Sequence, residues 1–140
     1  MTIKYHPAQG AIVFVDFSSG FVEPEMVKKR PAVVLSPNIK ARAQLVTVVA
    51  LSTTAPNPVQ PYHTEIDVPL QLPRNLASRC WVKGDMVNAV GFQRVDLIRL
   101  GKDRTGRRRY QEKPLPPDVF RKVRRCVLHG IGLSTLTKHL

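Results

Sequence analysis

Short apolar runs separated by loops that contain proline and glycine occupy the first two thirds of the chain. Residues 11–17 and 32–35 are nearly continuous apolar runs, which is typical of strands buried on both faces. Several such runs with turn residues between them predict a small antiparallel barrel rather than alternating strands and helices. Two of the strands are expected to lie on either side of Gly84. The predicted strands span residues 11–17, 32–35, 45–52, 63–68, 80–83 and 86–90.

The apolar pattern becomes helical only near the C-terminus. From 118 to 129, apolar residues recur at spacings of one, three and four, which predicts an amphipathic helix with basic side chains in solvent. Gly130 follows this segment and is expected to end the helix. Residues 101–117 are polar, basic and rich in proline, and are expected to form a loop. The basic residues of the helix are Arg121, Lys122, Arg124 and Arg125.

The length of 140 residues favours a single domain over 1–140. The expected fold class is mainly β, with about six or seven short antiparallel strands and one C-terminal amphipathic helix. The tail of the chain shows no pattern that predicts an element. The expected parts are a barrel over 8–100, a basic loop over 101–117, a helix over 118–129 and a tail over 130–140.

The charge of the chain points to a polyanionic partner. It has 22 basic and 10 acidic residues, a formal net charge of +12 and a pI near 10.4. Such an excess favours nucleic acid first, an acidic protein second and an anionic membrane third. No apolar run approaches the roughly 18 residues that a membrane span requires, and the first residues lack the features of a signal peptide. We therefore expect a cytoplasmic protein that does not enter a membrane.

The two cysteines, Cys80 and Cys126, lie far apart in apolar surroundings. This position is typical of buried thiols in a reducing compartment rather than of a disulfide. Together with the four histidines, they show no spacing typical of metal ligands. We therefore expect neither a metal site nor another cofactor.

A single arginine, Arg30, stands directly before Pro31, where the second predicted strand begins. Proline is tolerated mainly at the first residues or on the edge of a strand, because it has no N–H to donate to the sheet. Arg30 is therefore expected at the rim of the sheet, beside the loop over 18–29. Such a position suits a guanidinium that grips a phosphate.

Four segments, in the order of the chain, resemble the MazF/PemK (Kid) family of toxins from toxin–antitoxin systems. The resemblance implies an SH3-like barrel that forms a homodimer in the bacterial cytoplasm. It also implies cleavage of single-stranded RNA, as an mRNA interferase, without a metal ion, and inhibition by a cognate acidic antitoxin. The segments are residues 10–17, 29–37, 48–53 and 81–87.

RNA cleavage without a metal proceeds by attack of the 2′-hydroxyl on the adjacent phosphorus, which leaves a 2′,3′-cyclic phosphate. The charge that develops on the phosphate oxygens is stabilised well by a planar guanidinium, which donates two parallel hydrogen bonds. By its place before Pro31, Arg30 matches the catalytic arginine of the family and is also a candidate proton donor. Ser52, with Thr53 beside it, matches the hydroxyl residue that holds the scissile phosphate.

Lys83 and Asp85 flank Gly84 and are expected to point to one side of an extended chain. In members similar to Kid the first of these positions is an arginine, so Lys83 is a departure that removes a bidentate grip. Asp85 is a candidate general base for the 2′-hydroxyl if it is removed from water. The alternative is an ordinary surface pair of a lysine and an aspartate.

Further residues are candidates for contact with RNA. His63 lies in a predicted strand, where it is either an RNA contact or base, or a structural histidine. Lys28 and Lys29 precede Arg30 and add positive charge at the start of its strand. Trp81 either stacks on a base or packs in the core or a dimer interface, and its apolar neighbours favour packing.

Basic residues also cluster beyond the predicted barrel. They either attract phosphates independently of sequence or bind an acidic antitoxin. Two functions other than RNA cleavage fit the sequence: a CcdB-like protein that traps DNA gyrase without cleaving anything, and a basic SH3-like module that binds nucleic acid passively. Arg30 together with Ser52 favours the ribonuclease, because a gyrase poison needs no phosphate clamp. The cluster consists of Lys102, Arg104, Arg107, Arg108 and Arg109.

Overall fold

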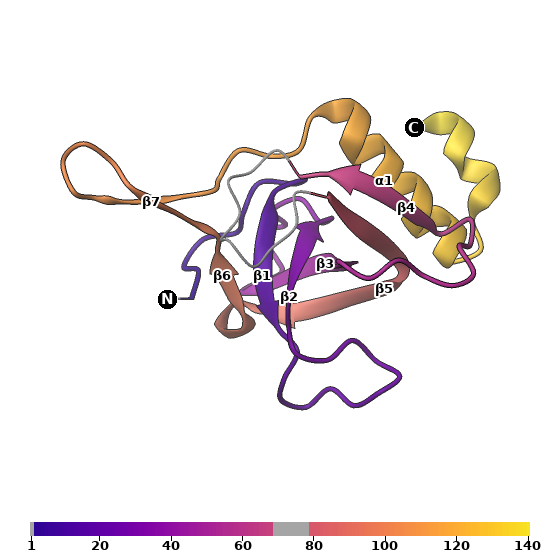
Figure 1. Cartoon of the computed structure of the whole chain (residues 1–140), viewed down its shortest axis with the longest axis horizontal. Coiled ribbons are helices and arrows are strands. Elements are labelled where there is room, and N and C mark those ends of the chain that lie inside the picture. The colour runs from indigo at the N-terminus through magenta and orange to yellow at the C-terminus, as the bar shows by residue number, and fades with distance from the viewer. Residues whose placement is uncertain (1, 69–78) are drawn as a thin grey trace.

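The computed structural model describes residues 2–68 and 79–140, and its main feature is one antiparallel sheet (Figure 1). The strands lie in the order β4–β5–β3–β2–β1–β6, and each pairing between neighbours is antiparallel. The predicted fold class, mainly β with a C-terminal helix, is confirmed. The strands are β1 (Ile12–Asp16), β2 (Lys29–Val34), β3 (Leu45–Ser52), β4 (His63–Asp67), β5 (Arg79–Gly91) and β6 (Val95–Leu97).

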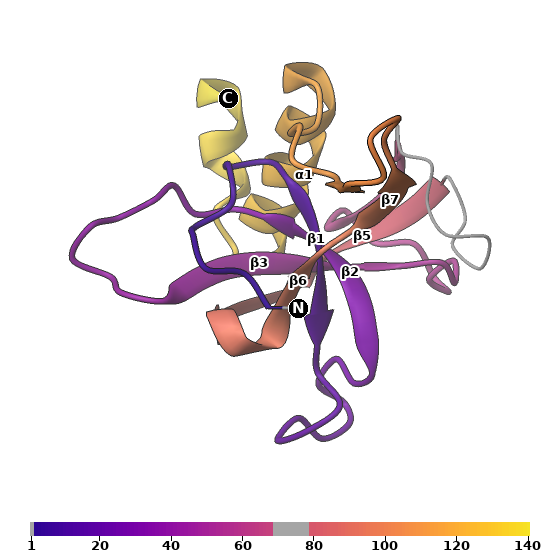
Figure 2. The ribbon, with the colours of Figure 1, turned by 90° about the vertical axis from the view of Figure 1, so that its left-hand side faces the viewer.

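The sheet is strongly curled, but within the described residues its two edge strands do not pair with each other. Figure 2 shows strands that cross at steep angles, as in a partly rolled sheet. The N-terminal segment lies along β6, where the N–H of Ile3 donates to the carbonyl of Val95 over 3.0 Å. The predicted barrel is therefore open rather than closed, because this segment occupies an edge that closure would need.

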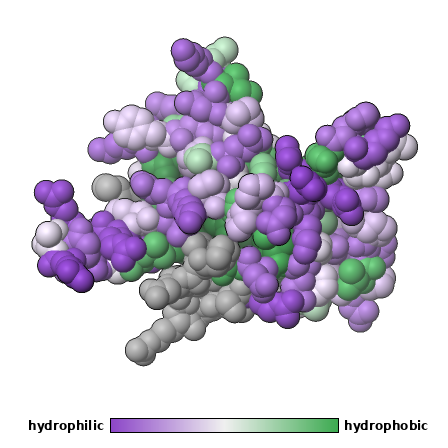
Figure 3. Space-filling view, turned by 90° about the horizontal axis from the view of Figure 1, so that it is seen from above, coloured by the Kyte–Doolittle hydropathy of each residue, from purple (hydrophilic) through white to green (hydrophobic). Residues whose placement is uncertain are grey.

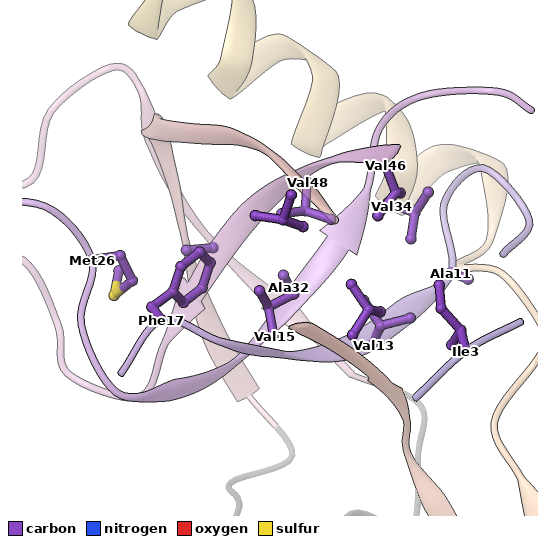
Figure 4. Close-up of a cluster of buried hydrophobic side chains, with 13 residues drawn as sticks. Ile3, Ala11, Val13, Val15, Phe17, Met26, Ala32, Val34, Val46 and Val48 are labelled. Carbon is purple, nitrogen blue, oxygen red and sulfur yellow. The ribbon is translucent and has the colours of Figure 1, made fainter. Parts of the chain in front are cut away.

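Alternate residues of the central strands face two different hydrophobic clusters. Val13 of β1 and Val34 of β2 belong to the cluster drawn in Figure 4. Their neighbours Ile12 and Val33 belong to the second cluster, on the other face of the sheet. All four side chains are buried, so the prediction that these strands are buried on both faces is confirmed.

Helix α1 (Pro117–Gly130) covers the second cluster and packs along β5. Val123 and Cys126 are its buried residues, and the four basic residues predicted to face solvent are exposed. Proline at the first helical position suits the start of a helix, because its missing N–H would have no partner there. The predicted helix over 118–129 is confirmed, with one more residue at each end.

The residue that adopts the left-handed conformation after the helix is Gly132. Gly132 has a φ of +79°, and its N–H donates to the carbonyl of His129 over 3.2 Å. The N–H of Leu133 donates to the carbonyl of Leu128 over 2.8 Å, which completes a Schellman motif. The predicted end of the helix at Gly130 is confirmed, since Gly130 is its last helical residue, but the left-handed residue of the motif is Gly132. The tail continues as a short 3₁₀ helix, η2 (Ser134–His139).

Strand β5 is one strand of 13 residues, where two short strands around Gly84 were predicted. The strand continues past Gly84 because a β-bulge accommodates extra residues of β5. Val82 pairs with Leu51, whereas Val87 pairs with Val49. Residues 83–86 of β5 therefore lie opposite a single residue of β3. The bulge bends β5 where Lys83 and Asp85 are located.

The segment predicted to be a basic loop over 101–117 begins as a β-hairpin. β7 (Arg99–Lys102) pairs with β8 (Arg108–Tyr110), and the pair projects from the body of the molecule (Figure 1). Seen from above, this projection is mostly hydrophilic (Figure 3). The loop prediction is wrong here because an exposed ribbon needs no apolar alternation. A 3₁₀ turn, η1 (Phe92–Arg94), joins β5 to β6.

Candidate active site

A row of side chains crosses four strands at one end of the sheet. On β5, Trp81 lies opposite Ser52 of β3 and opposite Glu65 of β4. Continuing the register of the paired residues of β2 and β3 places Arg30 opposite Ser52. Cross-strand partners share one face of a sheet. Two predicted site residues, Arg30 and Ser52, are thereby brought together on the same face.

Arg30 occupies the beginning of β2, opposite Val15 of β1. Its side chain is half-buried, and its Nε donates to the carbonyl of Val27 over 3.4 Å. Arg30 also lines an open groove of about 500 Å³, together with residues 23–27 and Met86. The guanidinium is therefore held at the rim of the sheet, beside the loop over 18–29, as expected.

Two hydroxyl residues lie at the end of β3. Ser52 is only 7% exposed, and its Oγ accepts a hydrogen bond from the N–H of Thr54 over 3.2 Å. This local turn fixes the Ser52 hydroxyl beside the strand end. Thr53 follows it and is exposed. The hydroxyl of Ser52 also donates to the carbonyl of Thr54 over 3.5 Å, so a phosphate would compete with this long bond for the hydroxyl proton.

His63 and Lys83 form the next cross-strand pair on the same face as Trp81, and both are half-buried. The N–H of Gln60 donates to Nδ1 of His63 over 3.0 Å. Burial lowers the pKa of His63, the neighbouring charge of Lys83 lowers it further, and Asp85 opposes both effects. His63 is therefore neutral near pH 7, and its proton is on Nε2, which makes that atom a hydrogen-bond donor rather than a base.

Asp85 follows Gly84 in the bulge of β5 and is exposed. It lies close enough to His63 to affect the titration of that imidazole. The structure thus places Lys83, Asp85 and His63 in one neighbourhood, next to the row that contains Arg30 and Ser52. It places Asp85 in solvent, so the removal from water on which its role as a general base depends is absent from the protein alone.

Two glycines hold the bulge against the helix. A Cβ atom on Gly84 would lie 2.3 Å from the carbonyl oxygen of Cys126, and one on Gly130 would lie 2.5 Å from the carbonyl oxygen of Gly84. The N–H of Gly84 also donates to the carbonyl of Tyr62 over 2.9 Å. The sequence analysis missed this contact. Its signal was a glycine inside a strand, which often marks a close approach of backbones.

The loop beside Arg30 is attached to the body by a residue that the sequence analysis missed. Arg94 donates from Nη1 to the carbonyl oxygens of Asp16, over 3.0 Å, and Ser19, over 2.7 Å. Its guanidinium also lies 5.0 Å from the ring centre of Phe21, which packs edge-on against Phe17. Phe21 therefore anchors the loop.

Lys28 and Lys29, which were also predicted to contact RNA, do not share the position of Arg30 on the sheet. Lys29 pairs with Asp16, so its side chain lies on the opposite face of the sheet from Arg30. Hydrogen bonds from Ser18 lower the pKa of Asp16, and Lys29 contributes a smaller effect. Lys28 is exposed and has a φ of +72°. At the start of β2, Arg30 therefore lies in the row of side chains with Ser52, whereas Lys29 does not.

In residues 2–68 and 79–140, no group of three or more His, Cys, Asp or Glu side chains is arranged to hold a metal ion. No helix there is both long and apolar enough to span a membrane. Cys80 and Cys126 are buried thiols, and burial raises the pKa of Cys126 to about 11.

Comparison with known proteins gives the class of protein. The model of the family described as the PemK-like, MazF-like toxin of type II toxin–antitoxin systems matches residues 8–130. The chain therefore belongs to the PemK/MazF family of toxins. An uncharacterized protein of Haemophilus influenzae (strain ATCC 51907 / DSM 11121 / KW20 / Rd) is 30% identical over 147 residues, which cover 97% of this chain and 98% of that protein.

Solved structures of MazF proteins share the fold. MazF from Deinococcus radiodurans (Form-I) has a TM-score of 0.60 and 22% identity, over 92% of this chain and 99% of that one. An endoribonuclease in complex with its cognate antitoxin, from a mycobacterial species, has a TM-score of 0.56 and 19% identity, over 91% of this chain and 97% of that one. The agreement extends over nearly the whole chain.

Proposed function

We propose that this protein is the toxin of a type II toxin–antitoxin system and acts as a metal-independent endoribonuclease on single-stranded RNA. The observation that supports this most is that Arg30, which lines an open groove, lies on the same face of the sheet as Ser52 when the register of β2 and β3 is continued. A relative with the same fold is an endoribonuclease solved with its cognate antitoxin. An acidic antitoxin and a homodimer belong to the same proposal, and the net charge of +12 suits both RNA and an acidic partner.

In the proposed reaction the 2′ oxygen of a ribose bonds to the adjacent phosphorus, and the bond from phosphorus to the 5′ oxygen breaks. The products are a 2′,3′-cyclic phosphate and a 5′-hydroxyl. Arg30 donates two hydrogen bonds to the non-bridging oxygens, where negative charge develops. The hydroxyls of Ser52 and Thr53 hold the phosphate in the orientation that attack requires.

Two protons must move during this step. Asp85 takes the proton of the 2′-hydroxyl, and bound RNA supplies the exclusion of water that the exposed carboxylate requires. A guanidinium does not lose its proton at neutral pH, so Arg30 stabilises charge and the 5′ oxygen takes its proton from water. His63 donates from Nε2, and Lys83 supplies a positive charge, so both bind the RNA backbone.

The test is cleavage of single-stranded RNA in the presence of EDTA. We expect wild-type protein to cleave and to leave a 2′,3′-cyclic phosphate end. Arg30→Ala is expected to lower kcat/KM by about 10²- to 10³-fold, since it removes the group that stabilises the developing charge. Arg121→Ala is the matched control, because it removes one exposed guanidinium from α1 and is expected to cleave like wild type.

Three outcomes would contradict the proposal. Equal activity of Arg30→Ala and Arg121→Ala would remove Arg30 from the reaction. Intact RNA together with arrested supercoiling by DNA gyrase would identify a gyrase poison. Binding of RNA without cleavage by wild type would identify a passive nucleic-acid module. Thermal unfolding of each variant shows whether a loss of activity reflects chemistry or a loss of fold.

A further inference from the structure

The β7–β8 hairpin concentrates positive charge at one end of the molecule. Its residues from 99 to 110 include six basic side chains and one carboxylate, that of Asp103. All six basic residues are exposed. In Figure 1 the hairpin projects at the left, whereas the loop between β3 and β4, which follows Ser52, lies at the right. The basic residues are Arg99, Lys102, Arg104, Arg107, Arg108 and Arg109.

The turn of the hairpin is ordered by its one carboxylate. Asp103 Oδ1 accepts hydrogen bonds from the N–H of Thr105, over 2.8 Å, from its hydroxyl, over 2.7 Å, and from the N–H of Arg107, over 3.0 Å. The Thr105 hydroxyl and the Arg107 N–H contribute most to lowering the pKa of Asp103. Since this carboxylate is used within the turn, the basic side chains are presented on a preorganised support, which reduces the entropy cost of binding.

One face of the hairpin leads into a groove. Arg99 pairs with Tyr110, and Lys102 pairs with Arg108, so these four side chains share one face of the ribbon. Tyr110 lines a groove of about 380 Å³ that Tyr5 and the N-terminal segment also line. Tyr5 is 84% exposed, which leaves its ring available to a ligand. The side chains of Arg99, Lys102 and Arg108 therefore lie next to a groove whose wall contains the rings of Tyr5 and Tyr110.

We propose that this surface is a second RNA-binding site, which holds single-stranded RNA outside the segment that is cleaved. The hairpin cations bind phosphates, and bases stack on both Tyr5 and Tyr110. Arginine outnumbers lysine on the hairpin and binds phosphate in a bidentate manner. The two exposed or half-buried rings favour RNA over an acidic peptide, because every base offers a face for stacking.

The inference rests on the proposed function, since that function makes RNA the polyanion in question. Its test nevertheless measures binding with cleavage removed. In an Arg30→Ala background, the affinity for a fluorescein-labelled single-stranded RNA of 30 nucleotides is measured between 50 and 300 mM salt, conditions over which phosphate contacts weaken by about tenfold or more. The variant combines Arg99→Ala, Lys102→Ala and Arg108→Ala, and the control combines Arg121→Ala, Lys122→Ala and Arg125→Ala on α1.

The hairpin variant is expected to reduce the slope of log Kd against log salt by about 2, because each phosphate contact to a single strand contributes about 0.7. The control, which loses the same charge, is expected to keep a slope near that of its parent. Tyr5→Ser alone is expected to weaken binding by about tenfold with the slope unchanged, since stacking involves no counterions. This single surface variant keeps the test sharp even where the triple variant folds poorly.

Equal slopes for the hairpin variant and the control would overturn the inference. So would a peptide of alternating glutamate and leucine that competes for the hairpin more strongly than the RNA, because the surface would then fit an acidic protein. RNA binding that depends on the hairpin, in a protein that cleaves no RNA, would leave this inference standing and refute the proposed function. RNA cleavage with no contribution of the hairpin to binding would refute this inference and leave the proposed function standing.

Discussion

The contact between Gly84 and Gly130 is the feature at the scale of residues on which the candidate site most depends. A Cβ atom on Gly130 would also lie 2.9 Å from the backbone nitrogen of Asp85. The backbone of α1 therefore touches the backbone of the bulge that carries Lys83 and Asp85. No side chain lies between the two backbones that could move aside for a larger residue.

Gly130→Ala is expected to lower the free energy of unfolding by about 1–3 kcal/mol, because overpacking forces shifts of the backbone. Urea unfolding measures this change. Lys122→Ala is the control on the same helix; it is exposed and is expected to change stability by no more than about 0.5 kcal/mol. A Gly130→Ala variant as stable as this control would show that the helix and the bulge separate easily.

A second residue-scale prediction concerns the protonation of His63. Burial and the charge of Lys83 lower its pKa from the ordinary value of 6.5, whereas Asp85 raises it. Folding therefore favours the neutral imidazole, and this residue contributes stability that is present above the unfolded pKa and is lost as the pH falls. Lys83→Met is expected to raise the pKa of His63, and Asp85→Asn to lower it.

The imidazole resonances in a pH titration by NMR report the pKa of His63 directly. Lys122→Met removes an exposed lysine from α1 and is expected to leave the His63 titration unchanged. A His63 pKa that is equal in wild type and in both site variants would mean that Lys83 and Asp85 do not lie near the ring in solution.

At the scale of elements, the loop between β1 and β2 is positioned by Arg94 of η1 together with its own Phe21. Arg94 donates to the carbonyls of Asp16 and Ser19, which lie 78 and 75 residues away along the chain. Hydrogen bonds from a charged donor contribute about 1.5–3 kcal/mol when well formed. The loop forms one wall of the groove beside Arg30.

Arg94→Ala is expected to accelerate amide hydrogen exchange in residues 19–26 by about tenfold or more, because local opening then costs less free energy. Arg42→Ala serves as the matched control, since Arg42 donates to the Thr47 hydroxyl over 2.8 Å in a different part of the molecule. That variant is expected to leave exchange in residues 19–26 unchanged. Similar exchange in both variants would mean that Phe21 holds the loop alone.

Elements with clear apolar patterns were predictable, and those defined by backbone geometry were not. The third predicted strand, 45–52, matches β3 at both ends, because most of its residues are buried. The basic hairpin was assigned to a loop because its exposed strands carry no apolar alternation. The end of α1 at Gly130 was predictable, but the sequence does not show that the glycine with a positive φ is Gly132.

Some residues of the candidate site were likewise predictable from the sequence, and others were not. Arg30 and Ser52 were predictable as neighbours because each occupies the end of a recognisable strand in a family motif. Glu65 lies in the same row, but its place depends on the pairing of β4 with β5, which strand patterns alone do not fix. Arg94 carries no local signal at all, because its partners are distant in the sequence.

At the scale of the whole molecule, positive charge is spread over several elements and is not confined to the candidate site. The exposed basic residues of α1 and of the hairpin surround a fold whose formal net charge is +12. Such a field attracts polyanions over a distance of about 8 Å at physiological salt. Attraction of this kind raises association rates and does not by itself select a sequence.

The two hydrophobic clusters share the strands β3 and β5. Val48 and Val90 face the first cluster, whereas Val49 and Val82 face the second. Neither cluster can therefore come apart while the other stays intact, and denaturation is expected to be a single cooperative transition. The row of side chains that contains Arg30 and Ser52 is therefore expected to be lost in the same transition. A destabilising core substitution far from Arg30 is then expected to lower the fraction of molecules that are folded. The chemistry of the molecules that remain folded is unchanged.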